Sequence, residues 1–160
     1  MAIAHTRNAL DSNAKSTAVG LLQARLVDSI DLALTVKQAH WNLHGAAFIA
    51  VHEFLDGLRT AVDDYADTIA ERARALGGTP VGTVQTVAEK TALAPYPTNL
   101  HAIEDHLRAL ADRVAAVTNA VRHNIDDATE AGDANTADVF TEVSRGLDKW
   151  LWLIESHLPN

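Results

Sequence analysis

Over four long stretches of this chain, apolar residues recur at alternating spacings of three and four, and this periodicity predicts amphipathic helices rather than strands. The first stretch runs from about residue 16 to 44, and the second from 48 to 76. The third begins at about residue 98, and the fourth covers the end of the chain from about residue 140. The fold class is therefore predicted to be all-α, a bundle of four long helices.

The connection between the second and third helices is predicted to be long. The run 77–80, Gly-Gly-Thr-Pro, is a strong helix stop. Thr98 or Asn99 can cap the third helix. Residues 79–97 are too many for a turn, which predicts a crossover, and the stretch 84–93 has the character of a short extra helix within it.

Composition excludes several classes of protein. The 160 residues suffice for one domain with a sizeable core, and we predict a single domain over 16–160 behind a flexible tail, 1–15. A formal charge of −8 excludes a generally basic surface that coats nucleic acid. The absence of cysteine excludes disulfides, thiol catalysis and cysteine-ligated metal sites. There is no apolar run of membrane-spanning length and no apolar core of a secretory signal, so no membrane partner is expected.

Two pairs of potential metal ligands, each at i, i+4 spacing, lie on the second predicted helix. With His52 at zero on a helical wheel, its partner Asp56 falls near 40°, and the second pair, Asp67 and Glu71, falls near 60° and 100°. The apolar stripe centres near −100°, so the polar face points roughly 150° away from it. Imidazole and carboxylate together suit iron, zinc or manganese. Exposed helices often carry such residues without a metal, so the spacing alone favours an ordinary solvated face.

The separation of the two pairs limits how they can act. Asp56 and Asp67 are eleven positions apart, which places them roughly 16 Å apart along the helix axis. Either each pair forms a weak half-site, or two chains meet antiparallel about a two-fold axis and share two sites. His40 can reach the first pair once the chain turns at Gly45. No histidine follows a glutamate by three positions, so a di-iron core inside one bundle, built from Glu-x-x-His, is not expected.

Several longer motifs are more specific than these pairs. They are the runs KQAHWN at 37–42, VHEFLD at 51–56, DTIAER at 67–72, ALGGTP at 75–80 and LDKWLW at 147–152. Together they resemble the Dps family, the DNA-binding proteins from starved cells, also called miniferritins. The resemblance covers nearly the whole chain from about residue 17.

This resemblance implies a ferritin-like bundle that assembles into a hollow homododecamer in the bacterial cytoplasm. It implies ferroxidase centres between two-fold-related subunits, each with two irons, for which zinc or manganese are possible substitutes. One subunit supplies His40, His52 and Asp56, and its neighbour supplies Asp67 and Glu71. Proteins of this family oxidise Fe(II), preferably with hydrogen peroxide, and store the ferric product as a mineral.

Further residues receive possible roles, some from the same resemblance and some from their position on the helical wheel. Trp41 matches a tryptophan beside the centre that intercepts oxidising equivalents. Glu53 and Asp63 lie near the polar face and are candidates for mineral nucleation, with ordinary surface charge as an equal alternative. The acidic stretch before the fourth helix is a candidate for a pore that steers Fe(II) inward, with Asp133 and Asp138 as first choices and a solvated loop as the alternative.

DNA binding is predicted to be weak or absent. Lysine-rich tails are typical of members that bind DNA directly, but the only firm cations before residue 16 are Arg7 and Lys15, opposed by Asp11. Few phosphates can then be neutralised. Two other functions remain as alternatives at this point: a nucleoid protein that compacts DNA, and a zinc hydrolase that uses the same ligands.

Overall fold

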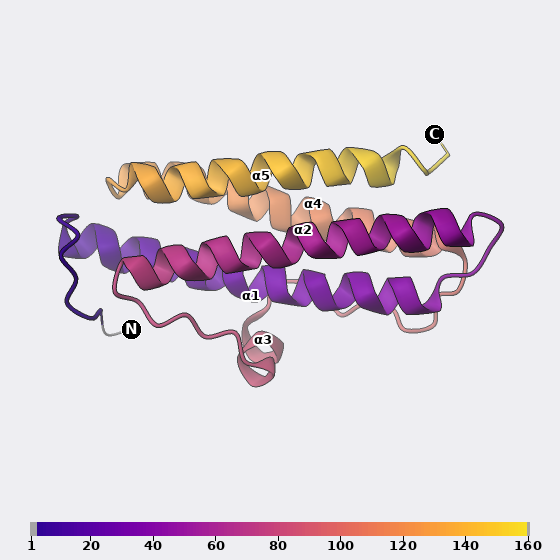
Figure 1. The fold of residues 1–160 in the computed structure, drawn as a ribbon, viewed down its shortest axis with the longest axis horizontal. Coiled ribbons are helices and arrows are strands. Elements are labelled where there is room, and N and C mark those ends of the chain that lie inside the picture. The colour runs from indigo at the N-terminus through magenta and orange to yellow at the C-terminus, as the bar shows by residue number, and fades with distance from the viewer. Residues whose placement is uncertain (1–2, 160) are drawn as a thin grey trace.

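Five helices make up the described part of the chain (Figure 1). The computed structural model describes residues 3–159; residues 1, 2 and 160, at the outer ends of the predicted tail and domain, lie outside that range. The helices are α1 (Ser12–Asn42), α2 (Phe48–Ala75), α3 (Val84–Lys90), α4 (Ile103–Glu130) and α5 (Ala134–Glu155). The predicted all-α fold is confirmed, with the short helix α3 in a long crossover.

The long helices form a bundle of two antiparallel pairs (Figure 1). α1 packs against α2 and α4, and α4 packs against α5. The crossover carries the chain back along the bundle, so that α2 and α4 run in the same direction. Among the described residues, no helix is long and apolar enough to cross a membrane.

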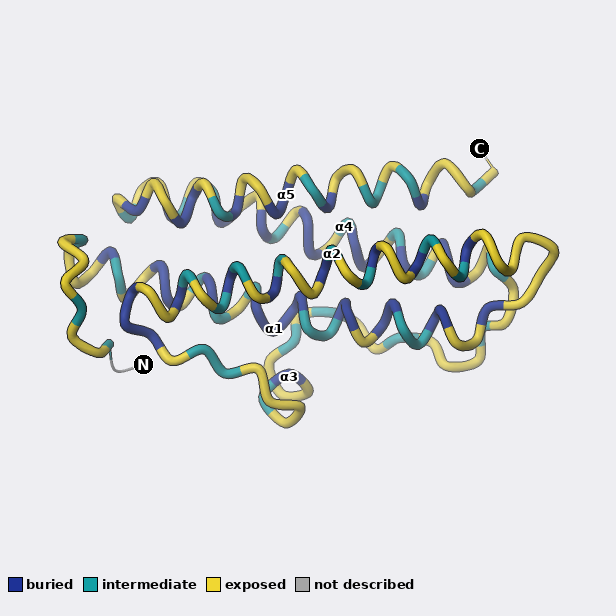
Figure 2. Tube along the Cα trace, in the orientation of Figure 1, coloured by how far each residue is buried: buried dark blue, intermediate teal, exposed yellow. Residues whose placement is uncertain are grey.

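The predicted apolar stripes form the core of the bundle. Figure 2 shows buried positions on the inner sides of the long helices and exposed positions on their outer sides. Among the largest fully buried side chains are Leu22, Leu55, Leu58, Leu110 and Phe140. Burial of each such side chain contributes about 1.5–3 kcal/mol to folding, which fixes the faces that the helices turn inward.

The first helix begins earlier than the apolar periodicity predicts. It starts at Ser12 rather than at about residue 16, because the side chain of Asp11 accepts a hydrogen bond from the backbone of its first turn. The segment before it contacts the bundle, where the N–H of Ala4 donates to the carbonyl oxygen of Gly77 over 2.8 Å. Part of the predicted tail is therefore helical, and the division into tail and domain otherwise stays a prediction.

The crossover is tied to α1 along its length. It leaves α2 at Gly77, whose φ of +91° confirms the predicted helix stop. Gln23 then pairs with the backbone of Val81 through two hydrogen bonds of 2.8 Å. The buried carboxylate of Asp28 accepts the N–H of Ala92 over 3.0 Å. These contacts hold the crossover against the side of the bundle.

The predicted cap of the third long helix is wrong. α4 begins at Ile103 and has no side-chain cap, so neither Thr98 nor Asn99 fills that position. The cause is a tertiary contact with His44 in the turn between α1 and α2. The N–H of His44 donates to His101 over 2.8 Å, and its carbonyl oxygen accepts from Ile103 over 3.3 Å. This pairing keeps the residues before Ile103 out of the helix and holds the start of α4 against the turn that precedes α2.

Candidate metal centre

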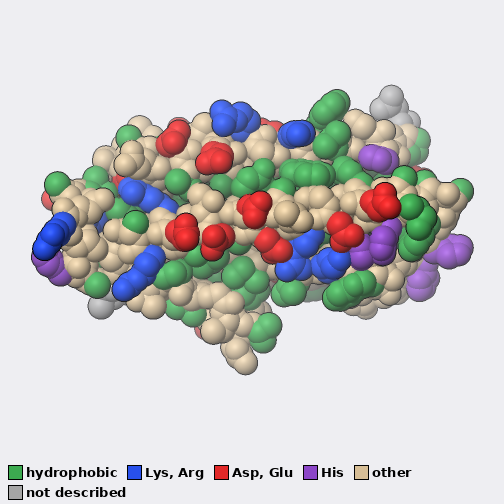
Figure 3. Space-filling model, viewed as in Figure 1, with side chains coloured by type: hydrophobic (Ala, Val, Ile, Leu, Met, Phe, Trp, Pro, Cys, Tyr) green, Lys and Arg blue, Asp and Glu red, His purple; other side chains and the backbone are tan. Residues whose placement is uncertain are grey.

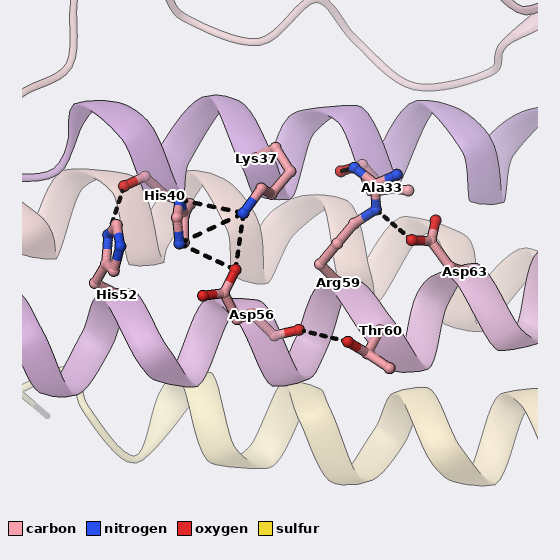
Figure 4. Close-up of polar contacts among 8 residues, drawn as sticks. All are labelled: Ala33, Lys37, His40, His52, Asp56, Arg59, Thr60 and Asp63. Carbon is pink, nitrogen blue, oxygen red and sulfur yellow. Dashed lines mark hydrogen bonds and ion pairs between the residues drawn. The ribbon is translucent and has the colours of Figure 1, made fainter.

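Three of the predicted ligands come together where α1 and α2 meet (Figure 4). His40 lies in the last turn of α1, and His52 and Asp56 lie in the first turns of α2. One potential ligand atom from each of them lies within 4.8 Å of the others. Over residues 3–159 no other group of three or more such side chains meets this condition. The predicted reach of His40 to the first pair is confirmed.

The imidazole of His52 is oriented by the backbone of α1. Its Nδ1 atom lies 3.0 Å from the carbonyl oxygen of His40, so Nδ1 carries the proton and donates it there. The Nε2 atom, which does not face this carbonyl, is then left for a metal ion, an arrangement that is common among metal-binding histidines. The rings of His40 and His52 stack with centroids 3.6 Å apart, and Phe48 lies 5.0 Å from the His52 ring.

Asp56 is the exposed member of the group. Its carboxylate accepts a hydrogen bond of 2.8 Å from the Lys37 ammonium and lies 3.0 Å from Nε2 of His40. The hydrogen bond from Lys37, helped by that from His40, holds the pKa of Asp56 below its ordinary value. The carboxylate is therefore ionised at neutral pH and suited to bind a cation. Its side chain is 53% exposed, whereas that of His40 is 8% exposed, so the group opens to solvent on one side.

Lys37 is the residue of this group to which sequence reasoning gave no role. Its Nζ atom also lies 3.4 Å and 3.5 Å from the two ring nitrogens of His40. Lys37 stands three positions before His40 on one helix, a spacing that places both on the same face. That spacing was the available signal, although a lysine is not a metal ligand when protonated.

Asp67 and Glu71 lie further along α2 and do not join this group. Both are exposed, together with Asp63 and Asp64 on the same helix. Figure 3 shows acidic side chains spaced along the face over α2, with most of the visible histidines toward the right end of the view. One chain thus brings together three of the five predicted ligands and carries the other two elsewhere on its surface.

Comparisons with known proteins identify the family. The family model described as the ferritin-like domain matches residues 19–160. The chain is 56% identical over 153 residues to the DNA protection during starvation protein of Agrobacterium fabrum, covering 96% of this chain and 94% of that one. The Dps protein of Mycobacterium smegmatis in a tetragonal form superposes with a TM-score of 0.93 at 31% identity, covering 99% of this chain and 96% of that one. This chain belongs to the Dps family of ferritin-like proteins.

A further Dps relative supports the same assignment. The structure of Dps from Microbacterium arborescens in the high iron form is 36% identical, with a TM-score of 0.86. The match covers 93% of this chain and 98% of that one. These matches over nearly the whole chain agree with the resemblance to the Dps family that the shorter sequence motifs indicate.

The tryptophan predicted beside the centre of this Dps protein stands at the edge of a groove. Trp41 is 67% exposed and follows His40 directly in α1. It lines a groove of about 450 Å³ together with Leu34, Lys37 and Tyr96. The groove adjoins the candidate metal-binding group because Lys37 lines the groove and contacts Asp56. A redox role of Trp41 stays a prediction.

The two candidates for mineral nucleation differ in their surroundings. Glu53 is exposed on α2. Asp63 is also exposed but accepts a hydrogen bond of 2.7 Å from Nε of Arg59, one turn earlier on α2 (Figure 4). The charge of Asp63 is therefore partly balanced within its own helix, which leaves Glu53 as the better candidate for nucleation.

Asp133, one of the two first choices for a pore residue, is buried and paired within the chain, and its pore role stays a prediction. Its side chain is 2% exposed and pairs with Arg72 over 2.7 Å. It also caps α5 by accepting from the backbone and hydroxyl of Thr136. Burial tends to raise the pKa of Asp133, but the hydrogen bonds from Thr136 and Arg72 outweigh burial and lower it. This carboxylate stabilises the turn before α5. Asp138 is exposed, and its pore role stays a prediction.

The acidic stretch itself is mostly helical. α4 continues to Glu130, so Asp126 and Asp127 lie within its last turns and a loop remains only at residues 131–133. The helix extends this far because the sequence there contains no helix breaker before Gly132.

Tyr96, which lines the groove, forms a pair with a buried histidine of α4. The hydroxyl of Tyr96 lies 2.6 Å from Nδ1 of His106, which is 1% exposed on α4. Burial raises the pKa of Tyr96 to about 12 and lowers the pKa of His106. The tyrosine therefore donates to a neutral imidazole. Sequence reasoning singled out neither residue, because this pairing depends on the path of the crossover.

Proposed function

We propose that this Dps protein oxidises Fe(II) at centres shared between two subunits and stores the ferric product inside a hollow homododecamer. The observation that supports this most is the division of the ligands. His40, His52 and Asp56 gather at one place, while Asp67 and Glu71 lie on the same helix beyond their reach. A second subunit placed antiparallel across α2 would bring the two sets together twice, about one two-fold axis.

The donor set suits iron chemistry. Two imidazoles and one carboxylate from one subunit bind Fe(II), and Asp67 and Glu71 of the partner subunit complete the centre. Such mixed ligands leave positions open to an oxidant. The carboxylates also favour the ferric product, which carries the larger charge.

We infer that hydrogen peroxide is the preferred oxidant. Reduction of peroxide to water needs two electrons, and each Fe(II) supplies one. A centre that holds two irons delivers both electrons without releasing hydroxyl radical. Trp41, beside His40, is placed to intercept oxidising equivalents that leave the centre.

Protection of DNA follows from this chemistry without tight DNA binding. A curated relative is named for DNA protection during starvation. Removing Fe(II) and peroxide from the bacterial cytoplasm removes the reactants that generate damaging radicals. We therefore propose detoxification and iron storage as the function of the assembly, and assign DNA compaction no main part in it.

The experiment that tests the function compares two double variants. His52→Ala with Asp56→Ala removes two ligands from the centre. His123→Ala with Asp127→Ala removes a pair of the same spacing on α4, where the two side chains lie 3.9 Å apart on the surface. Fe(II) oxidation is followed by absorbance with peroxide and with oxygen, and particle size and helicity are measured in parallel.

The proposal predicts that the first variant loses fast oxidation while keeping its helical shell, because His52 and Asp56 are not part of the apolar core. The second variant should oxidise Fe(II) at the wild-type rate. Wild-type oxidation by the first variant would refute the assigned centre.

A further inference from the structure

A cation of the protein already occupies part of the proposed centre. The Lys37 ammonium lies 2.8 Å from Oδ1 of Asp56, the same oxygen that lies 3.0 Å from Nε2 of His40. It also lies within 3.5 Å of both ring nitrogens of His40. Figure 4 shows the side chains of Lys37, His40 and Asp56 pointing toward one another. The lysine thus binds two of the three side chains that a metal ion would bind.

This contact places a positive charge of the protein beside the carboxylate of the group. Asp56 is the one carboxylate among the three residues of the group. The ammonium of Lys37 supplies one positive charge. A divalent ion that enters therefore meets a carboxylate that already pairs with a cation, and this cation lies close to the position of the ion and opposes its binding.

We propose that Lys37 is an internal competitor for the metal ion, which must displace the ammonium from Asp56 in order to bind. This inference rests on the proposed function of the centre. It makes Lys37 a residue that sets affinity without being a ligand. Its effect is to weaken the binding of the substrate metal to the half-site.

The contacts of Lys37 are of a kind that can be displaced. Its side chain is 24% exposed, and the carboxylate that it contacts is 53% exposed, so solvent screens the pair. Lysine is a flexible side chain with a point charge, in contrast to the rigid guanidinium of arginine. The groove of about 450 Å³ beside the centre, which Lys37 also lines, gives the displaced side chain a place to move.

Competition by Lys37 would help the centre to release its metal ion, which is a substrate and not a permanent cofactor. Iron that has been oxidised has to leave for the mineral so that the next Fe(II) can bind. An ammonium that returns to Asp56 as the product departs lowers the free energy of the empty centre. A centre without Lys37 would hold its metal more tightly and empty more slowly.

The test measures Co(II) binding to the assembled protein by calorimetry, with the visible absorbance of bound Co(II) as a second readout. Lys37→Gln and Lys37→Met remove the ammonium with little change in volume. Lys149→Gln removes an exposed lysine of α5 and is the matched control for net charge. Lys37→Arg keeps the charge at the centre.

Lys37→Gln and Lys37→Met should bind Co(II) roughly tenfold more tightly than wild type, which corresponds to about 1.4 kcal/mol. Lys149→Gln and Lys37→Arg should stay within about threefold of wild type, a difference of less than about 1 kcal/mol. A gain in affinity is informative because damage to the fold lowers affinity. Unchanged or weaker binding in both neutral variants would overturn the proposal.

The same titration separates this inference from the proposed function. His52→Ala with Asp56→Ala should abolish the Co(II) binding seen in wild type. If wild type and that double variant bind Co(II) alike, the centre itself is wrongly assigned, and the role of Lys37 fails with it. If the double variant loses binding and Lys37→Gln gains no affinity, the role of Lys37 alone fails.

Discussion

The Nδ1 atom of His52 lies 3.0 Å from the carbonyl oxygen of His40, so the backbone of one proposed ligand orients the ring of the other. This contact links the end of α1 to the first turns of α2. It determines which nitrogen of His52 faces the proposed metal ion. The structural and chemical roles of this histidine can therefore be tested separately.

His52→Asn retains an amide N–H near the position of Nδ1 but lacks any atom at the position of Nε2. We expect this variant to keep the wild-type free energy of unfolding, while His52→Ala loses about 1 kcal/mol with its hydrogen bond. Both should lose fast Fe(II) oxidation. Urea unfolding and stopped-flow absorbance measure the two effects, and rapid oxidation by His52→Asn would show that Nε2 is not a ligand.

The Tyr96–His106 pair predicts a pH dependence of stability. In the folded state, burial lowers the pKa of His106, whereas in the unfolded chain it lies at about 6.5. Below about pH 6.5 the unfolded state therefore binds a proton that the folded state does not, and the free energy of unfolding falls as the pH drops. Urea titrations at pH 7.5 and 5.5 should show a larger loss for wild type than for His106→Asn. An equal loss in both would contradict this.

Removal of the tyrosine hydroxyl tests the same pair at constant pH. Tyr96→Phe leaves Nδ1 of the buried His106 without its partner, which should cost about 1–2 kcal/mol. The midpoint of urea unfolding at pH 7.5 measures this. A midpoint equal to that of wild type would mean that the contact does not stabilise the crossover.

Asp133 and Asp138 are predicted to differ sharply when each is replaced by alanine. Asp133→Ala leaves the largely buried guanidinium of Arg72 unpaired and removes the cap of α5, which should cost about 3 kcal/mol. Asp138→Ala, at an exposed position on the same helix, should cost under about 0.5 kcal/mol. Thermal unfolding compares them, and equal stabilities would contradict the structural role of Asp133.

The lowered pKa of Asp133 predicts how the difference in stability between wild type and Asp133→Ala changes with pH. Because its folded pKa is lowered, its contribution to stability is present above the unfolded value of about 3.9 and is lost as the pH falls through the folded value. Acidification of wild type below about pH 4 should therefore reduce the difference between wild type and Asp133→Ala.

Retardation of DNA is predicted to be weak at neutral pH. The chain carries a formal charge of −8, and of the two cations in the N-terminal segment, Lys15 donates to the backbone oxygen of Asn8 over 2.6 Å. Eight histidines can gain charge below about pH 6.5, so binding should strengthen there. Gel shifts at two salt concentrations test this. Tight, salt-resistant complexes at about pH 7.5, where few histidines are charged, would restore DNA compaction as a main function.

The sequence predicts the bundle well because helix periodicity and core burial report the same faces. Leu55 and Leu58, which lie in the second predicted amphipathic stretch, are fully buried. The start of α4 escaped prediction because His44, distant in sequence, pairs with the segment before it. The burial of Asp133 escaped it because Arg72 approaches from another helix. Local patterns carry no information on such tertiary contacts.

The candidate site was predicted in its residues but not in all its contacts. The turn after α1 brings His40 to the pair on α2, as the chain length between them allows. The sequence did not predict a role for Lys37 at the site, because a protonated lysine is not a metal ligand. Its contact with Asp56 became visible only when both helices were placed.

The central claim is that two subunits share each metal centre, and subunit mixing tests it most directly. One variant lacks His52 and Asp56, the other lacks Asp67 and Glu71, and the two are dissociated, mixed equally and reassembled. Each mixed pair then contains one intact centre and one that lacks all four residues. Since half of randomly formed pairs are mixed, about a quarter of all centres should be intact, and Fe(II) oxidation should return to about a quarter of the wild-type rate. Inactive mixtures with proven co-assembly, or full activity in either parent, would contradict the shared centre.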